Sequence, residues 1–243
     1  MKTALILGGR SDIGLAAAHR FAAEGYAIQL AARNSATLEG DKADLELRHK
    51  IEVQLLDYDA LDTAVLRGFV DALQPLPDVA ICAVGTMETQ ADAEADPLLA
   101  ELTIRSNFEG PAQTLGLLAN AFASRGSGTL IGVSSVAGDR GRATNYIYGS
   151  AKAGFTAYLS GLRNRLAGQG VHVATILPGF VDTKMTEGME LPGKLTASPE
   201  EVAEAIWKAH EKRRNVVYVK PIWRVIMAII RNIPEQVFKR MKI

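Results

Sequence analysis

The sequence predicts an α/β protein: a doubly wound parallel sheet of about seven strands, covered by helices on both faces in three α/β/α layers. Short apolar runs alternate with longer amphipathic stretches along the whole 243-residue chain. Parallel strands need such crossover helices between them. The length suits one large domain, and no repeat, low-complexity linker or charge block marks a boundary. Ligands of such sheets bind at the carboxyl ends of strands, so site residues are expected directly after each strand.

The apolar runs predict the strands, and the amphipathic stretches predict the helices. Strands are expected over 3–7, 26–32, 51–56, 79–84, 129–134, 171–177 and 216–219. Helices are expected near 12–24, 35–49, 60–73, 92–105, 109–125, 145–168 and 199–213. The last helix has a clear start signal, because Ser198 can cap it, Pro199 suits its first turn and two glutamates follow.

The composition argues against several classes of protein. Equal numbers of basic and acidic residues, 27 each, argue against a protein that coats nucleic acid. The single cysteine, Cys82, excludes an intrachain disulfide, and the four scattered histidines predict no metal centre. No apolar run reaches the roughly 18 residues of a membrane span. The N-terminal apolar run is too short for a signal peptide, so a cytoplasmic location is expected.

A glycine-containing loop joins the first expected strand to the first expected helix. It reads Leu7-Gly8-Gly9-Arg10-Ser11-Asp12-Ile13-Gly14. Glycines let the backbone approach a phosphate, and a helix N-terminus offers free N–H groups and the positive end of a dipole. The loop therefore indicates either a nucleotide-binding turn or an ordinary tight turn.

Residues at the ends of the second and third strands bear on the choice of nucleotide. Arg33 can pair with a 2′-phosphate, whereas an acidic residue there would bind an unphosphorylated ribose. Arg33 therefore favours NADP over NAD, and Arg10 could join the same pocket; a solvated surface arginine is the alternative. Asp57 could accept a hydrogen bond from the adenine amino group, and Asp59 could cap the next helix.

Three side chains after the fifth strand indicate proton transfer. Ser135 follows that strand, and Tyr148 and Lys152, four residues apart on an expected helix, share one face. The pKa of a free phenol is about 10, and a nearby ammonium is expected to lower the pKa of Tyr148 toward neutral pH. A serine hydroxyl beside them can hold a carbonyl or alcohol oxygen. Each feature alone is common in structural roles, but together they indicate carbonyl–alcohol interconversion.

These motifs resemble, in order and spacing, those of the short-chain dehydrogenase/reductase family over roughly residues 3–215. The matching motifs are Gly8…Gly14, Cys82-Ala83-Val84-Gly85, Asn107, Ser135, Tyr148-x-x-x-Lys152 and Pro178-Gly179. The resemblance implies one Rossmann-type domain over 1–220 and an oxidoreductase dependent on NADP or NAD. It also implies reduction of a ketone to a secondary alcohol, or the reverse, and homodimers or homotetramers built through the long helices near 109–125 and 145–168.

The resemblance implies a role for each matching residue. Ser135 would orient the substrate oxygen, Tyr148 would be the general acid/base, and Lys152 would bind the nicotinamide ribose. Asn107 would hold a water in a proton relay; the alternative is a residue that only kinks its helix. With the residues already named, the expected cofactor-binding set is Gly8, Arg10, Ser11, Asp12, Ile13, Gly14, Arg33, Asp57, Ala83, Val84, Gly85, Tyr148, Lys152, Pro178, Gly179, Val181 and Thr183.

Two places depart from the family's pattern. Asp12 stands where a glycine usually lets the backbone approach the pyrophosphate. A carboxylate there would repel phosphate unless it turns outward, for example to cap the helix. Cys82 and Val84 replace asparagines that often brace the central strands. All four catalytic positions match.

The C-terminal part of the chain bears on the substrate. Segment 185–197 occupies the place of the family's mobile substrate loop. Residues 221–243 form a basic amphipathic tail, which suits either a membrane interface or packing on the body or a neighbouring subunit. The glycine-loop variant and this tail loosely resemble the branch that includes decaprenylphosphoryl keto-pentose reductases.

That branch implies a keto-sugar carried on a polyprenyl phosphate as substrate. A 3-oxoacyl compound or another small carbonyl compound is the alternative substrate. A catalytically silent nucleotide-binding scaffold is the alternative of another class, and it is disfavoured because Tyr148 and Lys152 are both present.

The zero net charge is a cancellation between two parts of the chain. Residues 211–243 contain nine basic and two acidic residues, a net charge of +7, and the remainder carries −7. The basic end is compatible with peripheral contact to the inner face of an anionic membrane.

Overall fold

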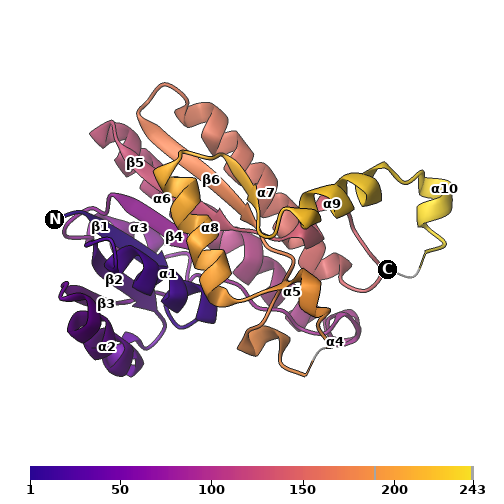
Figure 1. The fold of residues 1–243 in the computed structure, drawn as a ribbon, viewed down its shortest axis with the longest axis horizontal. Coiled ribbons are helices and arrows are strands. Elements are labelled where there is room, and N and C mark those ends of the chain that lie inside the picture. Colours follow the sequence, from indigo (N-terminus) through magenta and orange to yellow (C-terminus); the bar gives the residue numbers. More distant parts are fainter. Residues whose placement is uncertain (189, 242–243) are drawn as a thin grey trace.

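The computed structural model describes residues 1–188 and 190–241. Seven parallel strands form its central sheet, as expected (Figure 1). Their order in the sheet is β3-β2-β1-β4-β5-β6-β9. They are β1 (Thr3–Leu7), β2 (Ala27–Ala32), β3 (Val53–Asp57), β4 (Val79–Cys82), β5 (Gly128–Val133), β6 (Val171–Leu177) and β9 (Val216–Tyr218). Beside this sheet, β7 (Phe180–Val181) pairs with β8 (Thr196–Ala197) in a two-stranded ribbon that the sequence did not predict. The strand order reverses between β1 and β4, and such a switch point is where ligands bind.

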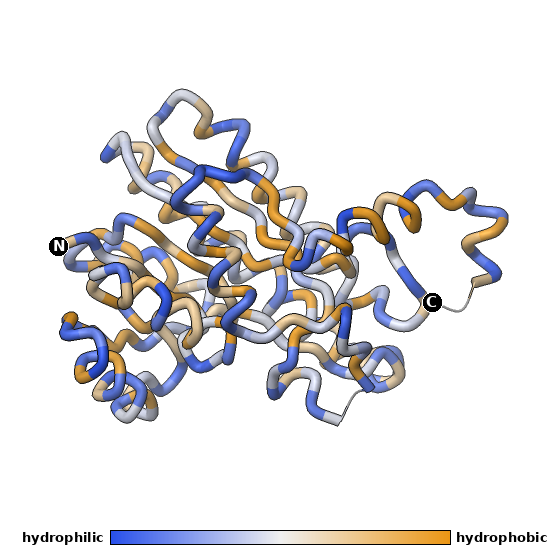
Figure 2. The backbone as a smooth tube through the Cα atoms, in the orientation of Figure 1, coloured by the Kyte–Doolittle hydropathy of each residue, from blue (hydrophilic) through white to orange (hydrophobic). Residues whose placement is uncertain are grey.

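Helices cover both faces of the sheet. One face packs against α1 (Asp12–Ala22), α2 (Glu39–His49) and α8 (Pro199–Glu211). The other packs against α3 (Leu66–Asp71), α6 (Gly110–Arg125) and α7 (Tyr146–Leu166). Successive side chains of β1 enter opposite cores, so the strand is apolar throughout rather than alternating. Figure 2 shows hydrophobic stretches along the central strands and a mixture of hydrophobic and hydrophilic residues along the surrounding helices.

Two expected helices are shorter or interrupted. The helix expected over 60–73 begins only at Leu66, since the Asp59 carboxylate accepts a hydrogen bond from Leu61 N at 2.9 Å and holds a turn. Asp59 therefore does not cap α3. The helix expected over 92–105 divides into α4 (Gln90–Ala95) and α5 (Pro97–Ile104). Pro97 excludes helical geometry for the residue before it, and Asp96 is extended and caps α5 through Leu98 N.

The C-terminal tail forms α9 (Ile222–Asn232) and α10 (Glu235–Phe238), which extend beyond the sheet (Figure 1). Trp223 and Met227 of α9 are buried in a small cluster that also holds Val136 and Leu177. The packing alternative therefore holds for one side of α9. Lys242 of the expected basic tail and residue 189 of the expected substrate loop lie outside the described residues. Within the described part of the chain, no helix has the length and hydropathy to cross a membrane.

Candidate active site

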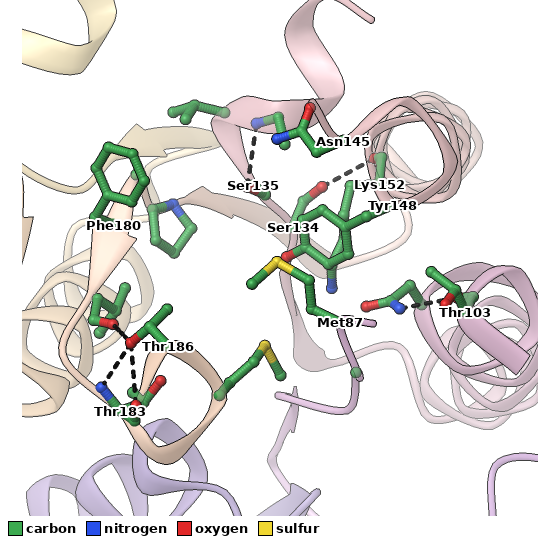
Figure 3. A pocket seen from close by; sticks show the side chains of 18 of the residues that line it. Met87, Thr103, Ser134, Ser135, Asn145, Tyr148, Lys152, Phe180, Thr183 and Thr186 are labelled. Carbon is green, nitrogen blue, oxygen red and sulfur yellow. Dashed lines mark hydrogen bonds between the residues drawn. The ribbon is translucent and has the colours of Figure 1, made fainter. Parts of the chain in front are cut away.

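A cavity of about 640 Å³ opens at the carboxyl ends of β4, β5 and β6 (Figure 3). All four expected catalytic residues line it, and they come from three separate parts of the chain: the π-helical segment with Asn107, the end of β5 with Ser135, and α7 with Tyr148 and Lys152. The expected cofactor residues that also line it are Ile13, Ala83, Val84, Gly85, Pro178, Gly179, Val181 and Thr183. The cavity lies at the edge of the sheet where the sequence predicts the site.

Ser135 leaves β5 in an extended conformation, with φ −165°, and begins the 3₁₀ turn Val136–Asp139. Its hydroxyl oxygen accepts a hydrogen bond from Ala137 N at 3.1 Å. The hydroxyl hydrogen is not used in that bond, so Ser135 can donate it to a substrate oxygen.

Tyr148 and Lys152 lie on the first turns of α7, which approaches the 3₁₀ turn closely. At Gly138, a Cβ would lie 2.6 Å from Ala153 N, so only glycine permits this approach. The hydroxyl of Ser134 secures the same contact through Lys152 O at 3.0 Å and Thr156 Oγ1 at 2.7 Å. The close packing brings Tyr148 toward Ser135, as Figure 3 shows.

Burial shifts the pKa values of both groups. It raises the pKa of Tyr148 to about 12, against a smaller opposing effect of the Ser135 hydroxyl. Burial also lowers the pKa of Lys152 to about 8. The expected lowering of the Tyr148 pKa by the ammonium is not found, because desolvation dominates and Lys152 Nζ lies 5.7 Å from the Tyr148 ring centroid. The phenol is therefore protonated at neutral pH and poised as a proton donor.

Asn107 lies in a π-helical segment, Arg105–Glu109, between α5 and α6. Its amide nitrogen donates to Thr86 O at 2.6 Å and Thr103 O at 2.8 Å. Its Oδ1 is buried and has no hydrogen-bond partner among the described residues. The helix is irregular at Asn107, which agrees with the alternative of a residue that kinks its helix. Asn107 also lines the cavity, and its Oδ1 has no partner there. Irregular π turns of this kind are frequent at functional sites.

A second cavity of about 310 Å³ adjoins the first at Ala83, Val84 and Gly85. Gly8, Arg10, Ser11 and Arg33 of the expected cofactor set line it. Gly8 has φ +90°, and a Cβ there would lie 2.9 Å from the Ala83 carbonyl. Arg10 Nη1 donates to Arg33 O at 3.0 Å, so the two arginines stand together. Two adjoining cavities, the smaller lined by a glycine turn and two arginines, fit a phosphorylated dinucleotide.

The family model described as short chain dehydrogenase matches residues 2–192. The chain belongs to the short-chain dehydrogenase family. It is 39% identical over 241 residues to an uncharacterized oxidoreductase of Mycobacterium tuberculosis, covering 98% of this chain and 96% of that one.

Solved structures share the fold at lower identity. A short-chain dehydrogenase from Sphingobium yanoikuyae in complex with NADPH superposes with a TM-score of 0.82 and 22% identity, over 97% of both chains. A variant of actinorhodin polyketide ketoreductase with NADPH gives 0.79 and 23% identity, over 90% of this chain and 95% of that one. The protein is thus an NAD(P)-dependent oxidoreductase of the short-chain dehydrogenase family with a Rossmann-type fold.

Asp12 of this dehydrogenase turns away from the glycine loop. Its Oδ2 accepts a hydrogen bond from Lys184 N at 2.9 Å, in the chain that follows β7. The helix cap is Ser11 instead, whose hydroxyl accepts from Gly14 N at 3.0 Å. The suggested capping role of Asp12 was wrong, because its carboxylate binds the backbone of Lys184 instead.

Three residues of the expected cofactor set line neither cavity: Asp12, Gly14 and Asp57. The Asp57 carboxylate accepts a hydrogen bond from Ser35 N at 2.8 Å, and that bond lowers its pKa. Tyr58 and Asp59, its neighbours, face the smaller cavity. Adenine binding by Asp57 stays a prediction. Asp59, unlike Asp57, lines the smaller cavity.

Several residues that line the larger cavity were missed in the sequence. They are Met87, Thr103, Arg142, Asn145, Phe180 and Trp223, whereas Met185, which also lines the cavity, falls in the expected substrate loop 185–197. Thr103 lies in α5, Phe180 in β7 and Trp223 in α9, and the others lie in connecting segments; no motif marks them. Trp223 reaches the site because α9 folds back on the body, where its indole N–H donates to Leu195 O at 3.0 Å.

Proposed function

We propose that this dehydrogenase uses NADPH to reduce a ketone to a secondary alcohol, with Ser135, Tyr148, Lys152 and Asn107 as its catalytic residues. One observation carries the proposal. These four side chains converge on a cavity that continues, past Ala83–Gly85, into a second cavity with a glycine turn and two arginines.

The bound nicotinamide would supply a hydride to the carbonyl carbon. The Ser135 hydroxyl holds the carbonyl oxygen, and the protonated Tyr148 phenol gives its proton to that oxygen as the alcohol forms. The ammonium of Lys152 stabilises the phenolate left behind and holds the nicotinamide ribose. The free Asn107 Oδ1 accepts a hydrogen bond from a water that returns a proton to the site.

Arg10 and Arg33 support NADP as the coenzyme over NAD, because a guanidinium pairs with the 2′-phosphate that NAD lacks. Two structural neighbours were solved with NADPH bound, which supports the same choice. We also propose that 1–220 form one domain to which the tail 221–243 belongs. Dimers or tetramers would form through α6 and α7.

The proposed substrate is a keto-sugar carried on a polyprenyl phosphate. Met87, Phe180, Met185 and Trp223 give the larger cavity apolar walls that suit a lipid chain. Trp223 also connects the cavity to α9, whose exposed apolar residues would contact the inner face of the membrane. A 3-oxoacyl or other small carbonyl compound is the alternative.

The experiment is a carbonyl panel with the full chain, with NADPH oxidation followed by absorbance. The panel contains a polyprenyl-linked keto-sugar, a 3-oxoacyl thioester and small ketones. Tyr148→Phe should reduce kcat by about 10²–10⁴-fold, the usual contribution of a general acid, while NADPH still binds. Tyr158→Phe, the same change farther along α7, is the control and should retain activity. Undiminished turnover in Tyr148→Phe would remove Tyr148 from the mechanism.

A further inference from the structure

We propose that Arg142 recognises an anionic group on the carbonyl substrate, a carboxylate, phosphate or sulfonate. The inference rests on the proposed carbonyl reduction and names the class of substrate. Arg142 lies in the connection between the 3₁₀ turn after Ser135 and the start of α7, and it lines the larger cavity. No motif marked it in the sequence.

Unpartnered polar atoms concentrate around this cavity. Among the described residues, seven buried side-chain N or O atoms have no hydrogen-bond partner. Four of them belong to residues that line the cavity: Thr103 Oγ1, Asn107 Oδ1, Arg142 Nε and Asn145 Oδ1. Buried polar groups are normally paired, because each unpaired one costs the free energy of desolvation. Such a cluster at one cavity indicates that a ligand supplies the missing partners.

The chemistry of Arg142 selects an anion. A guanidinium has five N–H donors, no acceptor and a permanent positive charge. Within residues 1–188 and 190–241, no acidic side chain lies at ion-pair distance from Arg142, the nearby charge of Asp139 acts on it only from farther away, and Nε is without an acceptor. Burial lowers the pKa of Arg142, which means that the charge is held partly away from water. A planar anion accepting two N–H bonds would satisfy this group.

Arg140, in the same connection, is an arginine whose guanidinium has hydrogen-bond and ion-pair partners. Its guanidinium donates to Ile230 O at 2.7 Å and Ile233 O at 2.6 Å, and it pairs with Glu235 at 2.9 Å. Arg140 therefore holds the tail in place, whereas Arg142 lines the cavity with its Nε unpartnered. The two arginines, two residues apart, have different roles.

The other charged residues that line the cavity are less suited than Arg142 to bind an anion. Lys152 is buried, donates to Val133 O at 3.2 Å and belongs to the catalytic group. Glu88 and Glu187 are acidic and disfavour an anion nearby. Asn145 follows Arg142 closely and donates its backbone N–H to Arg142 O at 3.1 Å. Its free Oδ1 would accept from a hydroxyl of the same substrate.

The test compares carbonyl compounds that differ only by an anionic group. One pair is dihydroxyacetone phosphate and dihydroxyacetone, and the second is acetoacetate and its methyl ester. A third pair, the polyprenyl-phosphate keto-sugar and the free keto-sugar, separates a lipid phosphate from a small anion. For each pair the ratio of kcat/KM is measured within one protein, so that any general defect of a variant cancels.

The parent should prefer the anionic member of at least one pair by about tenfold or more, the scale of one charge-assisted contact. In Arg142→Gln the ratio of kcat/KM should fall to about one. Arg142→Lys should keep part of the preference for the anionic compound, because lysine retains the charge but lacks the paired N–H donors of the guanidinium. Arg67→Gln is the control, because it removes the same charge from an exposed position on α3 and should keep the parent ratio. A parent without the preference, or Arg142→Gln with the full preference, overturns the inference.

A binding measurement separates this inference from the proposed function. Dihydroxyacetone phosphate is titrated calorimetrically into the NADPH-loaded parent and into Arg142→Gln. If no carbonyl compound is reduced, the proposed function fails; anion binding that is at least about tenfold weaker in the variant would still support Arg142 as the anion site. Equal binding, or no binding by the parent, overturns the inference even where neutral ketones are reduced.

Discussion

Burial raises the pKa of Tyr148 and lowers the pKa of Lys152. Desolvation disfavours the charged form of each group, so the phenol keeps its proton and the ammonium is easier to lose. At neutral pH Tyr148 is thus a donor, while Lys152, with a pKa of about 8, is still mainly charged.

The first residue-scale prediction concerns pH. The Lys152 ammonium is present below its pKa of about 8 and lost above it, while Tyr148, at about 12, stays protonated. We expect kcat/KM for ketone reduction to be level below about pH 7 and to fall roughly tenfold per pH unit well above pH 8. A pH profile between roughly pH 6 and 10 measures this. In Lys152→Arg, whose side chain stays charged, the falling limb should vanish; an unchanged limb would assign it to another group.

The second residue-scale prediction concerns the coenzyme. Arg33→Ala should weaken NADPH binding by about tenfold or more and leave NADH binding nearly unchanged, because only NADPH has the 2′-phosphate. Fluorescence titration with both coenzymes gives the two Kd values. Arg67→Ala, which removes an exposed charge on α3, serves as the control. If parent and Arg33→Ala showed the same preference, Arg33 would have no part in coenzyme choice.

At the scale of elements, contacts between distant parts of the chain position the walls of the site. Asp12 at the start of α1 binds the backbone of Lys184, and thereby joins the glycine loop to the chain after β7. Asn107 stands in the π-helical segment that leads into α6, and this irregular turn leaves its Oδ1 unpaired. The aspartate that departs from the family's pattern thus supports one wall of the site.

Helix α9 has two apolar sides with different surroundings. Trp223 and Met227 face the body and are buried, whereas Ile222, Val225 and Ile229 remain exposed. An ordinary surface helix has one apolar side, which it buries. The exposed side of α9 is therefore the part that suits a lipid interface.

At the scale of the whole molecule, charge is separated along the chain. The C-terminal 211–243 carries +7 and the remainder −7. Basic groups beside an exposed apolar helix side favour anionic lipid over zwitterionic lipid, and salt weakens that attraction.

The whole-molecule prediction is that the parent floats with anionic liposomes at low salt and is released at high salt. Val225→Gln with Ile229→Gln should abolish flotation, because it removes exposed apolar contacts but leaves Trp223 and Met227 packed. Leu47→Gln, an equally polar change at an exposed site on α2, is the control. If the parent did not bind anionic liposomes at low salt, α9 would serve packing alone.

The sequence by itself determined the alternation of strands and helices and the family, and it pointed to four proposed catalytic residues that the fold brings to one cavity. These depend on short-range regularities: apolar runs of strand length, the four-residue spacing of Tyr148 and Lys152, and a glycine turn after β1. The main errors in the helices, at 60–73 and 92–105, came from a side-chain turn and a proline that interrupt an otherwise helical pattern.

Only the tertiary structure decided the partner of Asp12, the packing of α9, the unpartnered Nε of Arg142 and the direction of the Tyr148 pKa shift. Asp12 and Lys184 are 172 positions apart, so no local pattern could join them. Whether a charged group loses its water depends on every element packed around it, and that exists only once the chain has folded. The residues of the site are thus readable from the sequence, but their electrostatics arise from the fold.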